Sequence, residues 1–143
     1  MRKCYEGNIR LNSKTIFVFG SNPQGRHGKG AALTAVKVFG AKYGIGEGLQ
    51  GNSYALPTKD LRVKKNRGFK SISPLQITEN IKKLYQVAIE NPDLEFCVAY
   101  RNTNQVSLNG YTGYQMMNMF LDAGNIPDNI IFSKEWILTE KFD

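Results

Sequence analysis

Short apolar runs alternate with longer amphipathic segments along the chain. The runs 15–20 (TIFVFG), 52–57 (NSYALP) and 94–100 (LEFCVAY) are short and almost wholly apolar, and Gly, Pro, Asn or polar residues bound them. Runs of this kind are typical of strands that are buried on both faces. A fourth run at 129–132 (NIIF) has the same character. We therefore expect four buried strands.

Helical spacing marks the segments between these runs. In 31–40 the apolar residues recur three and four positions apart, Lys37 falls on the opposite side, and Gly40 supplies a stop. The inward-facing residues of this segment are Ala32, Ala35, Val36 and Phe39. This pattern predicts a helix that directly follows the glycine-rich segment after the first strand.

Two further helices have recognisable start and stop signals. Ser73 and Pro74 form an N-cap and first helical position, with Gln76 placed to reach back as in a capping box, and Asn91-Pro92 ends the segment. Its apolar face comprises Ile77, Ile81, Leu84, Tyr85 and Ala88. Thr112 caps the last predicted helix, Gly124 closes it, and the residues expected to face inward are Met117, Phe120 and Leu121.

The resulting order, β-α-β-α-β-α-β, favours an α/β fold. Alternating strands and helices predict a mostly parallel sheet with helices on both faces and right-handed crossovers, a three-layer α/β/α arrangement. A length of 143 residues suits one domain. We therefore expect a single α/β domain over residues 1–143.

Glycines are concentrated around the first strand-to-helix connection. Nine of the fourteen lie between Gly20 and Gly51, which indicates that something approaches the backbone closely there. The segment 25–32 (GRHGKGAA) ends at a predicted helix N-terminus, whose unpaired N–H groups suit an anion. We expect a phosphate site, while the competing interpretation is a tight turn without a ligand.

Two common phosphate motifs do not match this loop. The segment 20–27 (GSNPQGRH) lacks the GK[ST] ending of a P-loop, since Lys29 is followed by glycine. The segment 28–33 (GKGAAL) has Leu33 where the dinucleotide fingerprint requires its third glycine. The sequence therefore argues against a P-loop NTPase and a Rossmann dehydrogenase.

The chain is basic, with 19 Lys and Arg against 12 Asp and Glu and a formal net charge of +7. This balance favours an anionic partner. Five cations lie within nine residues, at Arg62, Lys64, Lys65, Arg67 and Lys70. These cations could form a solvated loop over a small anionic ligand or, as an alternative, a nucleic-acid-binding surface. A third alternative is an interaction domain that binds no ligand.

The remaining composition narrows the class of protein. Cys4 and Cys97 match no disulfide framework, and the only histidine, His27, has no metal-binding partners nearby in sequence. We expect no metal and no cofactor. The chain lacks a segment of about 20 apolar residues and an apolar signal-peptide core. We therefore expect a cytoplasmic protein with no membrane partner.

Three short motifs carry a resemblance to a known family. Gly7-Asn8-Ile9 precedes the first buried strand, Gly20-Ser21-Asn22 ends it, and 25–32 opens the helix. In this order and spacing the chain resembles the macrodomain family of ADP-ribose-binding α/β modules. The loop GKGAA is similar to that of the branch that removes ADP-ribose from protein carboxylates. The resemblance implies a macrodomain-like fold and ADP-ribose, or an ADP-ribosylated macromolecule, as the partner.

The resemblance also implies individual ligand contacts. Asn8, beside Ile9, would stand at the position that binds the adenine amino group. Asn22, beside Ser21, would stand at the position that contacts the distal ribose. The backbone of Gly28, Lys29, Gly30 and Ala31 would hold the diphosphate. A second phosphate loop would span 107–113, with the residues Ser107, Gly110, Tyr111, Thr112 and Gly113.

Catalysis would depend on two positions. In the hydrolase branch a lysine at the end of the second strand and an aspartate in the later loop do the chemistry; here Lys59 resembles the lysine, and Asn109 stands near the aspartate. His27 is a further candidate for ligand contact or acid-base work, or an exposed loop residue. Whether the chain is an ADP-ribosyl glycohydrolase or only a binder is left open.

Overall fold

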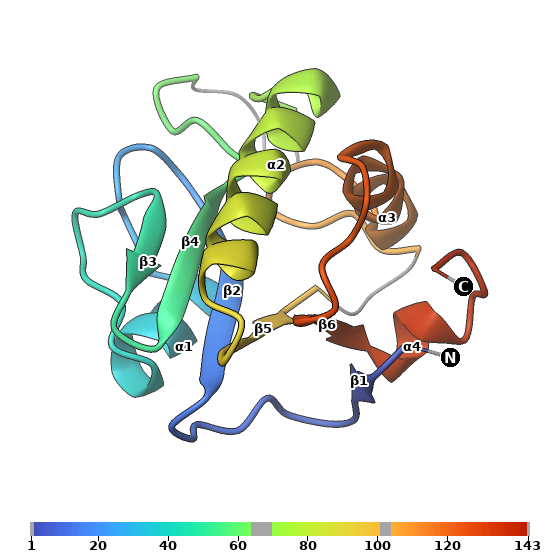
Figure 1. Cartoon of the computed structure of the whole chain (residues 1–143). Helices are drawn as coiled ribbons and strands as arrows, with labels where there is room; N and C mark the ends of the chain where they lie inside the picture. Colours follow the sequence, from blue (N-terminus) through green and yellow to red (C-terminus); the bar gives the residue numbers. More distant parts are fainter. Residues whose placement is uncertain (1, 64–69, 101–103, 143) are drawn as a thin grey trace.

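The computed structural model describes residues 2–63, 70–100 and 104–142, and in this part of the chain it contains six strands and four helices. The strands are β1 (Cys4–Tyr5), β2 (Thr15–Ser21), β3 (Gly48–Gln50), β4 (Ser53–Pro57), β5 (Glu95–Val98) and β6 (Ile130–Ser133). The helices are α1 (Gly30–Val38), α2 (Pro74–Glu90), α3 (Gly113–Asp122) and α4 (Lys134–Ile137). Figure 1 shows their arrangement.

The strands form one mixed, mostly parallel sheet in the order β1-β6-β5-β2-β4-β3. β2 lies at its centre and pairs in parallel with β4 on one side and β5 on the other. Only β3 runs antiparallel, against β4. The carboxyl ends of β2, β4 and β5 therefore meet at one edge of the sheet.

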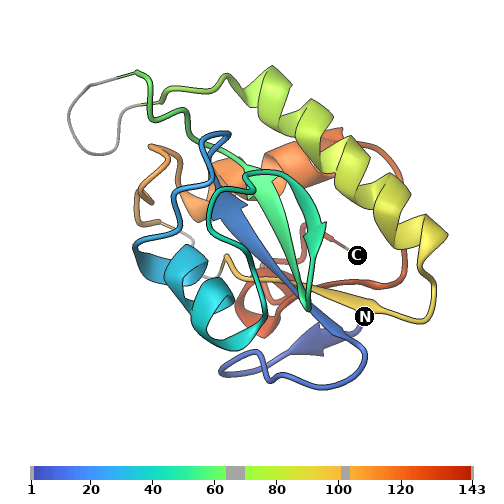
Figure 2. The ribbon, with the colours of Figure 1, turned by 90° about the vertical axis from the view of Figure 1, so that its left-hand side faces the viewer.

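Helices cover both faces of this sheet. One core cluster joins α2 and α3 to one face, where Ile81, Leu84 and Phe120 are fully buried. A smaller cluster on the other face holds Phe17, Phe19 and Ala55 against Ala35 of α1 and its C-cap residue Phe39. Figure 2 shows α1 and α2 on opposite sides of the strands. Burial on both faces explains why β2 and β4 have no charged side chains.

Most of the predicted elements are confirmed. Ser73 caps α2 by accepting a hydrogen bond from the Gln76 N–H, and Thr112 and Gln115 form a capping box at α3. One expected contact is wrong: the Gln76 side chain donates to Asn80 Oδ1, one turn ahead, instead of reaching back. Leu121 was expected to face the core but is 36% exposed, and Met116 takes an inward position instead.

Three short elements escaped the sequence pattern. β1 has two residues, β3 has three and α4 has four, which is too few for a period of hydrophobic positions to develop. The two strands depend on a neighbouring strand: β1 pairs with β6, and β3 pairs with β4. No helix in the described part of the chain combines the length and apolar character needed to cross a bilayer.

Candidate functional site

A cavity of about 750 Å³ opens at the edge of the sheet where β2, β4 and β5 end. We call it the main cavity. One wall comes from the end of β2, the start of α1 and the connection 22–29 between them, which we call the glycine-rich loop. The other walls come from the segments after β4 and β5. The lining residues are Gly20, Ser21, Asn22, Arg26, Gly28, Lys29, Gly30, Ala31, Ala32, Thr58, Lys59, Leu61, Tyr100, Ser107, Leu108 and Asn109.

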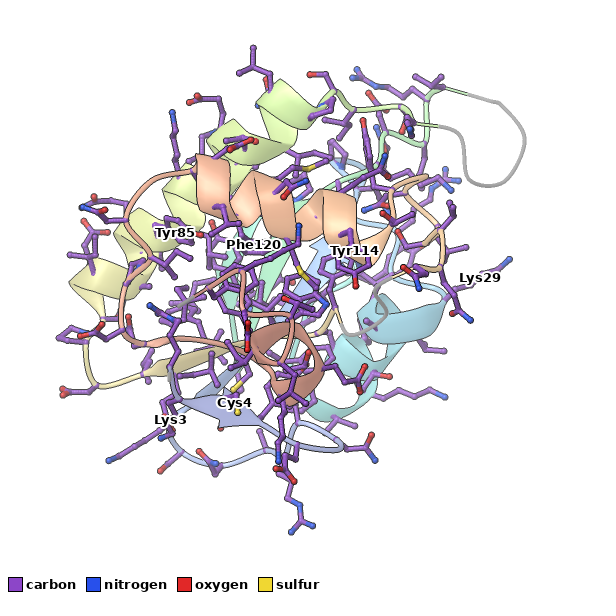
Figure 3. The ribbon with its side chains drawn as sticks, turned by 90° about the vertical axis from the view of Figure 1, so that its right-hand side faces the viewer. Lys3, Cys4, Lys29, Tyr85, Tyr114 and Phe120 are labelled. Atoms are coloured by element: carbon purple, nitrogen blue, oxygen red, sulfur yellow. The ribbon has the colours of Figure 1, made fainter. Side chains whose placement is uncertain are left out.

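The charges around the main cavity have one sign. Arg26, Lys29 and Lys59 line it, and no Asp or Glu is among its described lining residues. Arg26 and Lys29 are exposed, and Figure 3 shows Lys29 extending outward from the start of α1. Cations at the mouth of a cleft attract anions and accelerate their encounter with the site.

The N-terminus of α1 opens onto this cavity without a side-chain cap. Lys29 occupies the N-cap position and makes no capping hydrogen bond, whereas Ser73, Thr112 and Ser133 cap the other three described helices. The first N–H groups of a helix have no partner within the helix. The start of α1 therefore presents unpaired donors, with the positive end of the helix dipole, to the cavity.

Two side chains predicted to contact the ligand form hydrogen bonds with the protein. Asn22 Oδ1 accepts from the Arg26 N–H and Asn22 Nδ2 donates to the Arg26 carbonyl, both at 2.9 Å. Ser21 Oγ donates to the Gly46 carbonyl at 2.8 Å. Asn22 and Ser21 line the cavity but are only 8% and 3% exposed. Their side chains fix the shape of the loop that the backbone presents.

His27 lies outside the lining of the main cavity. It is 1% exposed and packs edge-on against Phe19, with ring centroids 5.1 Å apart. His27 Nε2 donates to the Ile45 carbonyl at 2.9 Å if that nitrogen carries the proton. The side chain thus joins the glycine-rich loop to the segment 42–47 behind it.

Asn109 lines the main cavity, yet its amide is occupied by the protein. Asn109 Oδ1 accepts from the Tyr111 N–H at 2.9 Å and also contacts Ser107 Oγ, while Nδ2 donates to Tyr100 Oη at 3.2 Å. An amide does not titrate in the physiological range, so it cannot replace a carboxylate as a proton acceptor. Asn109 therefore organises the later loop.

Lys59 also lines the main cavity. Next to it, Gln24 forms hydrogen bonds with Asp60 and Leu61, which we call the latch. The side chain of Gln24 donates to Asp60 Oδ1 at 2.9 Å and accepts from the Leu61 N–H at 3.0 Å. Hydrogen bonds from Arg62 hold the pKa of the Asp60 carboxyl far below its usual value. Asp60 thus stays ionised and fixes the segment that carries Lys59 relative to the glycine-rich loop.

The remaining predicted ligand residues lie outside the cavity lining. Asn8 is exposed, and Ile9 packs against the cluster beneath α1. Tyr111 is buried and donates its hydroxyl hydrogen bond to the Ile72 carbonyl at 2.6 Å. Gly110, Thr112 and Gly113 form the turn into the capped helix α3. Of the basic segment, Lys64, Lys65 and Arg67 lie outside the described residues.

The structure adds two polar residues that the sequence patterns did not single out. Thr58 directly follows β4 and Tyr100 lies two residues after β5, and their hydroxyl oxygens are 3.2 Å apart in the cavity lining. The available signal was their position, because site residues of parallel sheets gather just after strand ends. The glycine cluster by itself does not point to either Thr58 or Tyr100.

A second cavity, of about 530 Å³, differs in charge. It lies beside the start of α2, and its ionisable lining residues are Glu47, Asp60 and Lys83. Lys83 Nζ and Glu47 Oε2 are 3.9 Å apart, and Asp60 pairs with Arg62. Nearly balanced charge gives no preference for an anion. Within the described residues no three His, Cys, Asp or Glu side chains gather as metal ligands.

Comparisons with known proteins bear on the fold. A solved structure described as a protein of unknown function from Bacteroides thetaiotaomicron is similar, with a TM-score of 0.59 over 92% of this chain and 96% of that chain, at 12% identity. At this identity the similarity shows the fold alone. No family model matches the sequence, and no curated protein matches it significantly.

Proposed function

We propose that the protein binds ADP-ribose, or a related nucleotide diphosphate, in the main cavity. The observation that carries the proposal is the uncapped N-terminus of α1, which opens onto a cavity lined by three cations and no carboxylate among its described residues. A diphosphate satisfies the free N–H groups and the local positive charge together. The volume of about 750 Å³ falls in the range of small-molecule sites.

Two glycines at the start of α1 support a close approach of the ligand. A Cβ atom added at Gly28 or Gly30 would meet no protein atom within 4 Å. Gly30 has a φ of +57°, which favours glycine by itself, but Gly28 has no such requirement. The protein leaves the space at Gly28 empty, and a phosphate oxygen bound to the backbone N–H groups would fill it.

The resemblance to macrodomains narrows the ligand from any diphosphate to ADP-ribose. Two of the three motifs that carry it, Gly20-Ser21-Asn22 and 25–32, contribute residues to one wall of the main cavity, whereas 7–9 lies outside the lining. The side chains of Ser21 and Asn22 are largely engaged within the protein. We therefore assign the diphosphate contacts to the backbone of 28–32 and to the neighbouring cations.

The direct test is a titration with ADP-ribose followed by thermal unfolding. A ligand that binds only the folded state adds about 2.7 kcal/mol at 100 times its Kd. For a domain of this size that free energy raises the midpoint by several degrees. The absence of any shift at millimolar ADP-ribose would rule out the proposal.

A matched pair of variants locates the binding site. Gly28→Glu places a carboxylate in the space assigned to the phosphate, and we expect it to abolish the ADP-ribose shift while the unliganded midpoint changes little. Gln86→Glu makes the same change of charge on the exposed face of α2 and should leave the shift intact. Unchanged affinity in Gly28→Glu would refute this location of the site.

Hydrolysis of an ADP-ribosyl linkage is a separate expectation that depends on Lys59. Lys59 lines the main cavity and resembles the lysine of the hydrolase branch, whereas Asn109 is an amide held by the later loop. We expect Lys59→Ala to remove any release of ADP-ribose from modified protein carboxylates, while affinity for ADP-ribose falls by less than about tenfold. Equal turnover by both proteins would exclude Lys59 from the chemistry.

The alternative of nucleic-acid binding rests on the net charge of +7 and the cations between Arg62 and Lys70. Salt dependence separates the two functions. Binding through several backbone phosphates weakens steeply between 50 and 200 mM salt, by about 10³-fold or more for six contacts. A diphosphate held mainly by backbone N–H groups should lose much less affinity over the same range.

A further inference from the structure

The buried end of the main cavity is chemically different from its mouth. Gly20, Thr58, Tyr100 and Asn109 form it, and we call these four residues the hydroxyl floor. Thr58 and Asn109 are only 2% and 4% exposed, whereas the cations Arg26 and Lys29 are exposed. The floor is therefore neutral and polar, and positive charge belongs to the mouth.

The shape of the floor depends on Gly20 at the end of β2. A Cβ atom there would overlap Tyr100 Oη and lie 3.2 Å from Thr58 Oγ1. Gly20 does not have a positive φ, so the backbone conformation alone does not require glycine. The hydroxyl of Tyr100 occupies the space that a side chain at position 20 would take. The ring of Tyr100 is supported from behind by Trp136, with centroids 6.3 Å apart.

One of the two hydroxyl protons of Thr58 and Tyr100 is not used in a hydrogen bond within the hydroxyl floor. Thr58 Oγ1 and Tyr100 Oη share one hydrogen bond of 3.2 Å, and Asn109 Nδ2 donates a second bond to Tyr100 Oη. Burial raises the pKa of Tyr100, so its phenol stays protonated at neutral pH. Each hydroxyl carries one proton, and their shared bond uses only one of the two. The second has no acceptor among the described residues.

We infer that the Thr58–Tyr100 hydroxyl pair is a specificity element, which donates its spare hydrogen bond to a hydroxyl oxygen of the sugar attached to the far side of the ligand's diphosphate. The inference rests on the proposed function. A neutral donor suits a neutral acceptor, while the charged phosphates are attracted to the cations and the helix N-terminus. The floor would thus distinguish ADP-ribose from ADP, which lacks the terminal sugar.

The test compares the affinities of ADP-ribose and ADP for the wild type and for the double variant Thr58→Val/Tyr100→Phe, measured by calorimetry. Removing both hydroxyls should weaken ADP-ribose binding by about 3- to 10-fold, the contribution of one hydrogen bond, and leave ADP binding within about twofold. Each single variant retains one hydroxyl that can donate, so it should lose less than the double variant.

Tyr85→Phe is the matched control, because it removes a buried phenol hydroxyl that donates to the Phe120 carbonyl at 2.6 Å, outside the cavity lining. We expect it to change neither affinity by more than about twofold. If the double variant does not fold, Thr58→Ala/Tyr100→Phe removes the same two hydroxyls with a smaller side chain at position 58, and the selective loss of ADP-ribose affinity must appear there.

The outcomes separate the two proposals. A wild type that binds ADP-ribose, with variants that lose nothing or lose ADP and ADP-ribose affinity equally, overturns the hydroxyl floor alone. A wild type that binds neither ligand overturns the proposed function and this inference with it.

Discussion

The two faces of the glycine-rich loop use glycine for opposite reasons. On the inner face, a Cβ atom at Gly46 would lie 2.9 Å from the Pro23 backbone, and one at Gly25 would overlap the backbone of Gly44. On the outer face, a Cβ atom at Gly28 would meet nothing within 4 Å. The inner glycines let two segments of the chain touch, whereas Gly28 has open space beside it and lines the main cavity.

This comparison changes the meaning of the glycine cluster. Its density indicates close approach to the backbone, and at the inner face the approaching group is the segment 42–47 of the chain itself. The Gly44 N–H donates to the Gly25 carbonyl at 2.7 Å, and His27 and Ser21 add side-chain bonds to the same segment. Hydrogen bonds thus join the inner face to the segment 42–47, whereas a Cβ atom at Gly28 on the outer face meets no protein atom.

The largest expected effect tests whether the two faces differ in stability. Gly46→Ala forces a methyl group into the backbone of Asn22 and Pro23, and we expect the free energy of unfolding to fall by about 3 kcal/mol. Gly28→Ala should change it by less than about 0.5 kcal/mol. Urea unfolding measures both.

The two alanine variants control for each other, since each adds one methyl group at a glycine without a positive φ. Similar losses in both would show that the outer face is also held by the protein, and the distinction between the faces would be lost.

An intermediate effect is expected at His27, the side chain that joins the loop to 42–47. His27→Ala removes the hydrogen bond to the Ile45 carbonyl and the packing against Phe19, at a cost of about 2 kcal/mol. Affinity for ADP-ribose should stay within about twofold, because His27 does not line the cavity.

His27→Leu is the matched variant, because it keeps most of the volume and loses only the hydrogen bond. We expect it to cost about half as much as His27→Ala. A tenfold loss of ADP-ribose affinity in His27→Leu, with stability retained, would show that His27 contributes to ligand binding and not only to the inner face of the loop.

The smallest effect concerns the latch at Asp60 and follows from the sign of its pKa shift. Arg62 lowers the pKa of Asp60 in the folded state, so the ionised form stabilises folding above the unfolded pKa, near 3.8, and this stabilisation is lost as the pH falls further. The stability difference between wild type and Asp60→Asn should therefore be constant from pH 7 to 5 and shrink below pH 4. A difference that already disappears at pH 6 would contradict the assigned ion pair.

Local patterns predicted the elements that carry their own signals. The apolar runs of β2 and β4, the cap at Ser73 and the capping box at Thr112 each depend on residues within one or two turns of chain. β1 and β3 have only two and three residues, so hydrophobic periodicity could not reveal them. Each is held by pairing with another strand, β1 with β6 and β3 with β4.

The candidate site divides in the same way. The sequence identified Lys59, Asn109 and the glycine-rich loop, and Lys59, Asn109 and part of that loop line the main cavity. It could not tell that the side chains of Asn22, His27 and Asn109 would be taken up by the chain's own hydrogen bonds. The partner of His27 lies 18 residues away along the chain. The partners of Asn22 and Asn109 are only four and two residues away, but a motif does not fix the loop conformation that brings them into contact.

By itself, the sequence determined a mostly parallel α/β fold and a glycine-rich connection between a buried strand and a helix, because periodicity, caps and glycine density are properties of neighbouring residues. The tertiary structure decided which glycines face the protein and which face the cavity. It also brought Thr58 and Tyr100 together from two strand ends 42 residues apart. Only packing of the sheet sets those distances, since parallel strands align their carboxyl ends regardless of their separation along the chain.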